Sequence, residues 1–262
     1  MVKVGIIGGS GVYNTKLLKN EEKIKINTPY GPTSDLVTTG TINGVNVVFI
    51  PRHGSKHTIN PTNVNYRANI WALKELGVTH IIAPNAVGSL REEYKPGDLV
   101  FPDQFIDRTT KRISTFYEGN KVAHISVAEP FCINLNKLLS SKAKEARFRY
   151  HNKGCAIIIE GPRFSTKAES KMFQNWGGDI IGMTTVPECV LAREAGICYA
   201  SIGMVTDYDV WKEGDEVSTK KLIDTMKQNV EKVKKIITES INEIEKLDNT
   251  CGCKDAINQA FM

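Results

Sequence analysis

The amino-acid sequence predicts an α/β protein with a single domain, in which helices flank one mixed, twisted β-sheet. The chain has 262 residues, of which 41% are apolar and 24% charged, as is usual for a globular protein. Apolar strand-like segments alternate with amphipathic helical segments along most of its length. No internal repeat, low-complexity tract or Pro/Ser-rich linker divides it. One domain over residues 1–262 is therefore expected, with the assignment of the tail after about residue 247 left open.

The first elements are expected to be antiparallel strands. A strand at residues 2–7 runs into Gly8-Gly9-Ser10-Gly11, which invites a dinucleotide-binding interpretation. A Rossmann unit needs G-x-G-x-x-G followed by a full helix. Here only about nine residues intervene before further strands at residues 23–26, 35–42 and 45–50. The last two flank Asn43-Gly44, a strong hairpin-turn signal, so the Gly-rich turn must serve something other than NAD.

After the hairpin, helices and strands alternate. Helices are expected at residues 63–76, 133–147, 166–176, 186–195 and 218–247. Strands are expected at residues 80–84, 98–101, 123–126, 154–159 and 197–206. This pattern predicts helices on both faces of the sheet, and in such folds ligands bind beyond the carboxyl ends of the strands.

Composition and charge exclude several classes of partner. No apolar run approaches the roughly 18 residues of a membrane-spanning helix, and Met1 leads directly into a strand-like segment. We therefore expect a cytoplasmic protein with no membrane partner. The net charge of +5 comes from 34 basic and 29 acidic residues scattered along the chain. Nucleic acid is not an expected partner, because such surfaces cluster Lys and Arg with aromatic residues.

The cysteines leave two interpretations open. There are six: Cys132, Cys155, Cys189, Cys198, Cys251 and Cys253. No CxxC pair is followed by a second pair or by a His pair, so no metal site is expected. The first four lie beside apolar residues and are interpreted as small buried hydrophobes. The even count still allows disulfides, for which Cys251-Gly252-Cys253 is one candidate place.

Polar segments that follow apolar strands suggest a phosphate site. Gly8-Gly9 lets backbone N–H groups approach an anion, Ser10 adds a hydroxyl, and Arg52 supplies a bidentate fork. Thr185 with Glu188 predicts a capping box, which would place Thr184 just before a helix N-terminus that favours anions. Taken singly, each piece also fits an ordinary turn or a surface cation.

The pair Asp207 and Asp209 suggests a purine-binding site. Residues i and i+2 of an extended segment point to the same side, so the two carboxylates can converge on one ligand. When two carboxylates lie so close together, their repulsion raises the pKa of one of them. One carboxyl can then donate a hydrogen bond while the other accepts one. This matches the N7 acceptor and N6 amino donor of adenine. The competing interpretation is a solvated acidic loop.

Other candidate residues also allow both a functional and a structural interpretation. Phe164, in the segment Glu160 to Ser165, could stack on a base or fill the core. His53, His57 and His124 could bond phosphate or sugar, or could be structural.

Long motifs in order resemble the trimeric nucleoside phosphorylases, most closely those members that act on 5′-methylthioadenosine. They include GIIGGSG, PRHG, NAVGSLREEYKPGD, DQFIDRTTKR, IEGPRFSTKAES, MTTVPE, AREAGICYASI and TDYDVWKE, within a match from about Lys3 to the final helix. The resemblance implies phosphorolysis of 5′-methylthioadenosine to adenine and 5-methylthioribose 1-phosphate, a reaction of purine and methionine salvage. It implies no cofactor and no metal, with inorganic phosphate as co-substrate.

The resemblance also implies roles for individual residues. The implied phosphate ligands are Ser10, Arg52, His53, Asn85, Ala86 and Thr184. The implied substrate-binding residues are Met183 under the ribose, Phe164 beside the base, Asp207 at N7 as the catalytic group, Asp209 at N6, and His124 from a neighbouring subunit. Ser165 and Thr219 match positions associated with substrate preference. A site shared between subunits implies a homo-oligomer, a trimer or a hexamer.

Some residues depart from the family pattern. Pro84-Asn85 stands where close methylthioadenosine enzymes carry two threonines, and Gly182 resembles the branch that acts on 6-oxopurines. Thr219 replaces an apolar residue of the 5′ pocket. The alternative function is therefore a broad purine nucleoside phosphorylase acting on adenosine, inosine or guanosine. A non-catalytic nucleotide- or NAD-binding protein is the alternative of a different class.

Overall fold

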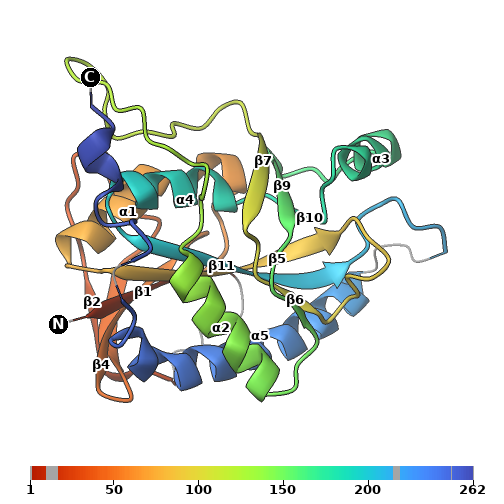
Figure 1. Cartoon of the computed structure of the whole chain (residues 1–262), viewed down its shortest axis with the longest axis horizontal. Coiled ribbons are helices and arrows are strands. Elements are labelled where there is room, and N and C mark those ends of the chain that lie inside the picture. The colour runs from red at the N-terminus through yellow and green to blue at the C-terminus, as the bar shows by residue number, and fades with distance from the viewer. Residues whose placement is uncertain (1, 10–16, 215–218, 249, 262) are drawn as a thin grey trace.

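The computed structural model describes residues 2–9, 17–214, 219–248 and 250–261 of the chain. One mixed sheet organises these residues, as predicted, and helices cover both of its faces (Figure 1). None of the described helices combines the length and the apolar character needed to cross a membrane.

The described part of the sheet contains eleven strands. They are β1 (Lys3–Gly8), β2 (Lys19–Ile24), β3 (Val37–Ile42), β4 (Val45–Pro51), β5 (His80–Ser89), β6 (Leu99–Val100), β7 (Gln104–Arg108), β8 (Tyr150–His151), β9 (Cys155–Ile159), β10 (Ile180–Gly182) and β11 (Cys198–Asp207). The main path through the sheet runs β2-β3-β4-β1-β5-β10-β9-β7.

The central strand β5 pairs with three others. It runs parallel to β1 over residues 80–82 and parallel to β11 over residues 80–88. Its last two residues instead pair antiparallel with β10. The chain thus crosses from one half of the sheet to the other along β5, and the carboxyl ends of β5 and β11 lie side by side.

The predicted antiparallel excursion is confirmed. β3 is antiparallel to both β2 and β4, while β4 returns parallel to β1. Asn43 and Gly44 connect β3 to β4 with φ of 50° and 85°. Both residues are therefore left-handed, which the favoured two-residue hairpin turn requires and which Asn-Gly tolerates.

Five α-helices complete the described fold: α1 (Tyr66–Glu75), α2 (Ile133–Glu145), α3 (Lys167–Asn175), α4 (Thr185–Glu194) and α5 (Thr219–Ile244). α1 and α4 cover one face of the sheet, and α2 and α5 cover the other (Figure 1). β11 shows why the sheet is covered on both sides. Its Ala200, Ile202 and Met204 enter the core under α2 and α5, whereas Tyr199 and Val205 enter the core under α1 and α4.

One expected strand is wrong, and three strands of the described fold were not expected. The strand expected at residues 123–126 is wrong: only Ala123 forms an isolated bridge, to Phe261. Strands β7, β8 and β10 were not predicted, because β8 and β10 have only two and three residues and β7 contains polar residues on both sides. The 198–207 and 219–244 elements match their predicted positions closely.

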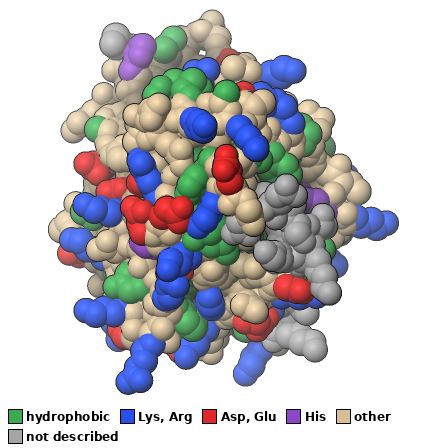
Figure 2. All heavy atoms as spheres, turned by 90° about the vertical axis from the view of Figure 1, so that its right-hand side faces the viewer, with side chains coloured by type: hydrophobic (Ala, Val, Ile, Leu, Met, Phe, Trp, Pro, Cys, Tyr) green, Lys and Arg blue, Asp and Glu red, His purple; other side chains and the backbone are tan. Residues whose placement is uncertain are grey.

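Figure 2 shows the end of the molecule toward which β5 and β11 run. Outside the grey residues, basic, acidic and hydrophobic side chains are interspersed on this face. The charge is therefore mixed here rather than gathered into a single basic stripe.

Candidate active site

A cavity of about 900 Å³ opens beyond the carboxyl ends of β1, β5, β10 and β11, as the fold class predicts. It brings together nine of the predicted site residues: Arg52, His53, Asn85, Ala86, Phe164, Met183, Thr184, Asp207 and Asp209. Gly9 and His57 also line it. The sequence motifs that seemed independent therefore share one site.

Of the other four predicted site residues, two are not described at their side chains and two do not line the cavity. Ser10 lies outside the described residues, and so does the side chain of Thr219, whose backbone begins α5. Ser165 is buried next to the cavity-lining Phe164. His124 is exposed and does not line the cavity of its own subunit; its backbone N–H donates to Ala260 O at 2.7 Å.

Arg52 is fixed by a buried bidentate ion pair. Its Nε and Nη2 donate to the two carboxylate oxygens of Glu188 at 2.7 and 2.8 Å. Nη2 and Nη1 also donate to the carbonyls of Ile7 and Pro84. Burial alone would lower the pKa of Arg52, but Glu188 raises it, so the guanidinium stays charged. Within the described part of the chain, these bonds engage all but one of its five N–H donors, and the remaining Nη1–H is available to a ligand.

The predicted capping box at Thr185 and Glu188 is wrong. Glu188 is turned inward, where it accepts from Arg52 and from Tyr199 Oη at 2.8 Å. Val186 has φ −107° and ψ 132°, so the first turn of α4 is interrupted. Thr184 is nevertheless the N-cap residue of α4, is buried, and makes no capping bond with its side chain. Its hydroxyl is thus free of the helix and lines the cavity.

His53 is a neutral acceptor at the same end of the cavity. Its Nδ1 lies 2.8 Å from Ile59 O, and because a carbonyl only accepts, Nδ1 carries the proton. Burial, reinforced by the positive charge of Arg52, lowers the pKa of His53 to about 4. At neutral pH its Nε2 therefore carries a lone pair, suited to a hydroxyl of a protonated phosphate.

A hydrogen bond from the neighbouring strand fixes the orientation of the Asn85 side-chain amide. Ser201 Oγ donates to Asn85 Oδ1 at 2.8 Å and lies on the adjacent strand β11. The Nδ2 group is left as the polar end of a residue that lines the cavity. Asn85 can therefore donate to an anion, although the family resemblance pointed to threonines there.

At the opposite end, Asp207 and Asp209 both line the cavity. The extended backbone expected between them is wrong, because β11 ends at Asp207 and Asp209 is left-handed. A Cβ on Gly88 of β5 would lie 3.1 Å from Asp207 Oδ1 and 3.3 Å from Asp209 Cβ. The two oxygens of Asp207 accept from Thr206 Oγ1 and from the backbone N–H of Asp209, at 2.7 and 2.8 Å. Asp209 reaches this position with φ +51°, a left-handed conformation that Asp tolerates better than most residues.

Asp209 is the less solvated of the two carboxyl groups. It is buried, and burial raises the pKa of Asp209 above its ordinary value. In the described part of the chain, its Oδ2 finds no hydrogen-bond partner, and neither do the buried hydroxyls of Ser165 and Ser170. Against the effect of burial, the hydroxyls of Ser170 and Ser165 lower the pKa of Asp209, so they lie near its carboxyl group without reaching hydrogen-bond geometry. The three groups form a buried polar cluster beside the cavity.

The middle of the cavity is apolar. Met183 packs against Gly161, where φ is +66° and a Cβ would lie only 2.5 Å from Met183 Sδ. Phe164 lines the rim and is 59% exposed, which is high for an aromatic side chain. Met226 and Val230 of α5 close another side. A flat or apolar moiety between an anion and a base would contact these groups.

Sequence reasoning missed Arg112, which holds the walls of the cavity together. Its Nη1 donates to the carbonyls of Met183 and Val186, and its Nε and Nη2 donate to the Glu160 carboxylate and carbonyl. Burial alone would raise the pKa of Glu160, but the backbone N–H groups of Thr110 and Lys111, together with Arg112, lower it to about 2. Arg112 ends the segment DQFIDRTTKR, which also resembles the family, but its role is not visible in the local sequence because its hydrogen-bond partners lie 46 to 74 residues away.

Comparison with known proteins places the chain among phosphorylases by sequence. Residues 3–242 match the family model described as the phosphorylase superfamily. The chain is 53% identical to the S-methyl-5′-thioadenosine phosphorylase of Nitrosopumilus maritimus, covering 99% of this chain and 98% of that one. It is 54% identical to the enzyme of the same name from Pyrococcus furiosus, with both chains covered in full.

The fold is also similar to those of solved phosphorylase structures. The methylthioadenosine phosphorylase from Schistosoma mansoni, solved in complex with adenine, superposes with a TM-score of 0.95 at 40% identity. That match covers 100% of this chain and 99% of the other. With a family match over most of its length and with these relatives, the chain belongs to the phosphorylase superfamily.

Proposed function

We propose that the protein catalyses the phosphorolysis of 5′-methylthioadenosine, giving adenine and 5-methylthioribose 1-phosphate. The supporting observation is that one cavity pairs an anion-binding end at Arg52 and Thr184 with a purine-binding end at Asp207 and Asp209. Relatives named S-methyl-5′-thioadenosine phosphorylase, at 53–54% identity over essentially the whole chain, point to the same substrate.

The phosphate end supplies the nucleophile. Arg52 and the Nδ2 group of Asn85 donate to phosphate oxygens, and the lone pair of His53 Nε2 accepts from its hydroxyl. A phosphate oxygen attacks the anomeric carbon as the bond to purine N9 breaks. The ribose becomes cation-like in the transition state, and the anion below it stabilises that charge. Arg52, which Glu188 holds in place, thus positions the phosphate for attack.

The base end receives the leaving group. The electron pair of the broken bond goes to the purine ring, which becomes a better leaving group when N7 is protonated or hydrogen-bonded. Asp207 is the group proposed to donate to N7. Asp209 accepts from the 6-amino group through Oδ2, for which the described residues provide no hydrogen-bond partner by geometry. Adenine leaves with the proton from Asp207, which regains one from solvent, and hydrogen phosphate loses one as its oxygen bonds to the anomeric carbon, so atoms and charge balance over the cycle.

No metal or nucleotide cofactor enters this mechanism, and inorganic phosphate is the co-substrate. We further propose that residues 1–262 form one phosphorylase domain. The tail after residue 247 supports this, because Cys253 and Ala260 are buried and Ala260 bonds the backbone at His124. A cytoplasmic location stays a prediction, tested by fractionation of the source cells.

The active unit is proposed to be a trimer or a hexamer. His124 is exposed and remote from the cavity of its own subunit, as a residue offered to a neighbour would be. Phe164 at the cavity rim is exposed in the isolated chain and would be covered by such a neighbour. The site would therefore be completed only on assembly.

A second candidate is a general purine nucleoside phosphorylase. The raised pKa of Asp209 favours it, since a protonated Asp209 could donate to O6 of hypoxanthine or guanine. An ionised Asp209 would instead repel O6 and prefer the 6-amino group. The first function is the better supported, because the relatives reported above are named for methylthioadenosine.

One experiment separates these functions. The pure protein is assayed with 5′-methylthioadenosine, adenosine and inosine, with and without phosphate, and kcat/KM is compared. We expect phosphate-dependent release of adenine, with methylthioadenosine the best substrate and inosine the poorest. Preference for inosine would establish the second candidate. Absence of phosphate-dependent turnover of any nucleoside would reject both.

A further inference from the structure

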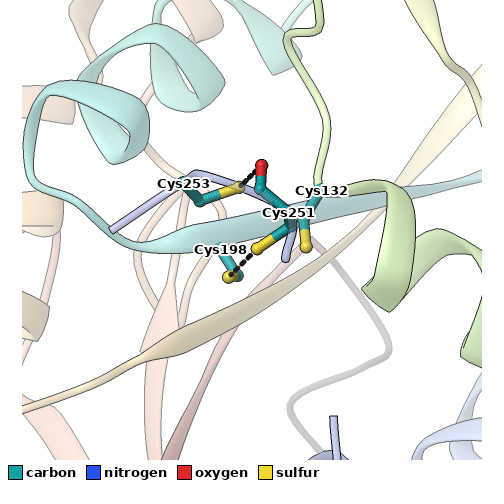
Figure 3. A group of neighbouring side chains, drawn as sticks. All are labelled: Cys132, Cys198, Cys251 and Cys253. Atoms are coloured by element: carbon teal, nitrogen blue, oxygen red, sulfur yellow. Dashed lines mark hydrogen bonds between the residues drawn. The ribbon is translucent and has the colours of Figure 1, made fainter. Parts of the chain in front are cut away.

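We propose that Cys132, Cys198, Cys251 and Cys253 form a structural site for one zinc ion. Their four Sγ atoms all lie within 4.8 Å of one another. Figure 3 shows the four sulfurs gathered at one place from three separate parts of the chain: the start of α2, the start of β11 and the tail. None of the four lines the active-site cavity, so the proposal is independent of the proposed function.

The sulfur spacing fits a tetrahedral ion. Zn–S bonds of about 2.3 Å place the sulfurs of a tetrahedral site about 3.8 Å apart. Cys198 Sγ and Cys251 Sγ are 3.6 Å apart, and all four thiols are free. This pair is near the tetrahedral separation, and every other pair of the four sulfurs lies within 4.8 Å. Four thiolates are a donor set typical of zinc among common cellular cations.

The local backbone explains how the tail supplies two ligands. Gly252 separates Cys251 from Cys253 and has φ +64°, a left-handed conformation open to glycine. The turn at Gly252 lets both thiols face the same point, although only one residue separates them. The familiar CxxC spacing is not required when the other two ligands come from a helix start and a strand start that are far away in the sequence.

The surroundings favour a negatively charged centre. Binding Zn²⁺ releases up to four thiol protons and leaves a complex with a net charge of −2, with no change of oxidation state. Arg193 Nη1 donates to Cys253 Sγ at 3.9 Å. Cys132 is the N-cap residue of α2, so the positive end of that helix lies at the site. Both features stabilise thiolate sulfur.

The site is closed, which indicates a structural role. Three of the four cysteines are buried and Cys251 is half-buried. Four protein ligands leave no position for a substrate, unlike a catalytic zinc site. The ion would tie the tail to α2 and β11, and thereby hold Ala260 against the loop that contains His124.

The first test measures metal in the full-length protein, purified without chelator and supplied with zinc. We expect about one zinc per chain by elemental analysis. Cys253→Ser and Cys198→Ser should lose most of it. The matched control is Cys155→Ser, a half-buried cysteine outside the cluster, which should retain it. Full zinc occupancy in both cluster variants would overturn the proposal.

A second test uses the unmodified chain, because a cluster variant could fail to fold. A mercurial thiol reagent should release zinc in step with modification of four thiols. Replacement by Co²⁺ should give thiolate charge-transfer and tetrahedral ligand-field bands. An intact mass two hydrogens lower per bridge, with no metal, would show disulfides and overturn the proposal. Six free thiols that take up no zinc, or stoichiometric iron in place of zinc, would overturn it as well.

Discussion

At the scale of single residues, the buried pair between Arg52 and Glu188 separates two roles. Arg52 is the proposed phosphate ligand, whereas Glu188 holds Arg52 and does not itself line the cavity. In Glu188→Gln, one acceptor is replaced by an amide that confronts the N–H donors of Arg52. We expect the phosphate KM to rise about tenfold or more, with the nucleoside KM much less affected.

The test for Glu188 uses steady-state kinetics with each substrate varied in turn. Glu239→Gln removes a carboxylate from an exposed pair with Lys235 and should leave both constants unchanged. A large stability loss is also expected for Glu188→Gln, because a buried charge loses its partner, so assays belong well below the measured Tm. An unchanged phosphate KM in folded Glu188→Gln would show that Arg52 does not depend on Glu188.

Asp209 gives a prediction about both base preference and pH. Its pKa is raised in the folded protein, so the folded state binds this proton more tightly than the unfolded state does. The ionised carboxyl therefore lowers stability at neutral pH, and this cost disappears as the pH falls through the raised pKa. Asp209→Asn should raise Tm at neutral pH, with a gain that shrinks in acid. Thermal unfolding across pH 4 to 8 measures this.

The same substitution should erode selectivity for adenine. Asn keeps the shape of the side chain but can also donate, so it accommodates a 6-oxo group. The ratio of kcat/KM for methylthioadenosine to that for inosine should fall. A parental ratio together with a parental Tm profile would place Asp209 outside the base site.

Asp207 should act on turnover instead. Asp207→Asn keeps a hydrogen-bond donor near N7 but removes the acidic proton, so kcat should fall by roughly 10² to 10⁴ if the group is a general acid. Single-turnover rates with methylthioadenosine at saturating phosphate isolate this step. A loss of less than a few-fold would favour the solvated-loop interpretation of the Asp207–Asp209 segment.

At the scale of elements, β5 presses directly against the base site. An alanine Cβ at Gly88 would lie 3.1 Å from both Asp207 Oδ1 and Ile181 Cγ2. Such approaches are tighter than ordinary van der Waals contact, so Gly88→Ala should displace the carboxylates and lower kcat/KM for the nucleoside. The phosphate KM should change little. Gly154→Ala is the control, because its Cβ would lie 3.3 Å from Val100 in a part of the sheet outside the cavity. Equal losses in both variants would mean that the added methyl groups act through general destabilisation and not through the base site.

Elements also show what the sequence could and could not predict. The Asn43-Gly44 hairpin and the long β11 and α5 were predictable, because each depends on local turn chemistry or sustained periodicity. The inward turn of Glu188 was not, because its partner Arg52 lies 136 residues away and a local motif offered a competing explanation. The cysteines pose the same difficulty: Cys132 and Cys198 meet the tail only in the folded chain.

At the scale of the whole molecule, assembly is expected to control activity. If His124 serves a neighbouring subunit, specific activity should fall on dilution as the oligomer dissociates, and sedimentation should show the same midpoint. His124→Ala should lower kcat/KM for methylthioadenosine while leaving the sedimentation coefficient unchanged. Full activity in a dilute monomer would contradict both the shared site and the oligomer.

The central strand β5 also fixes the distance between the two ends of the proposed site. Asn85 lies at the anion end and Gly88 lies beside the aspartates, and both belong to β5. Three residues of extended strand measure about 10 Å, so the backbone of β5 fixes the distance between the proposed positions of the attacking oxygen and the departing base. Side-chain substitutions cannot lengthen a distance that the main chain sets. Relatives that accept a different 5′ group would therefore vary along α5, at Met226 or Val230, while the spacing between phosphate and purine stays as β5 defines it.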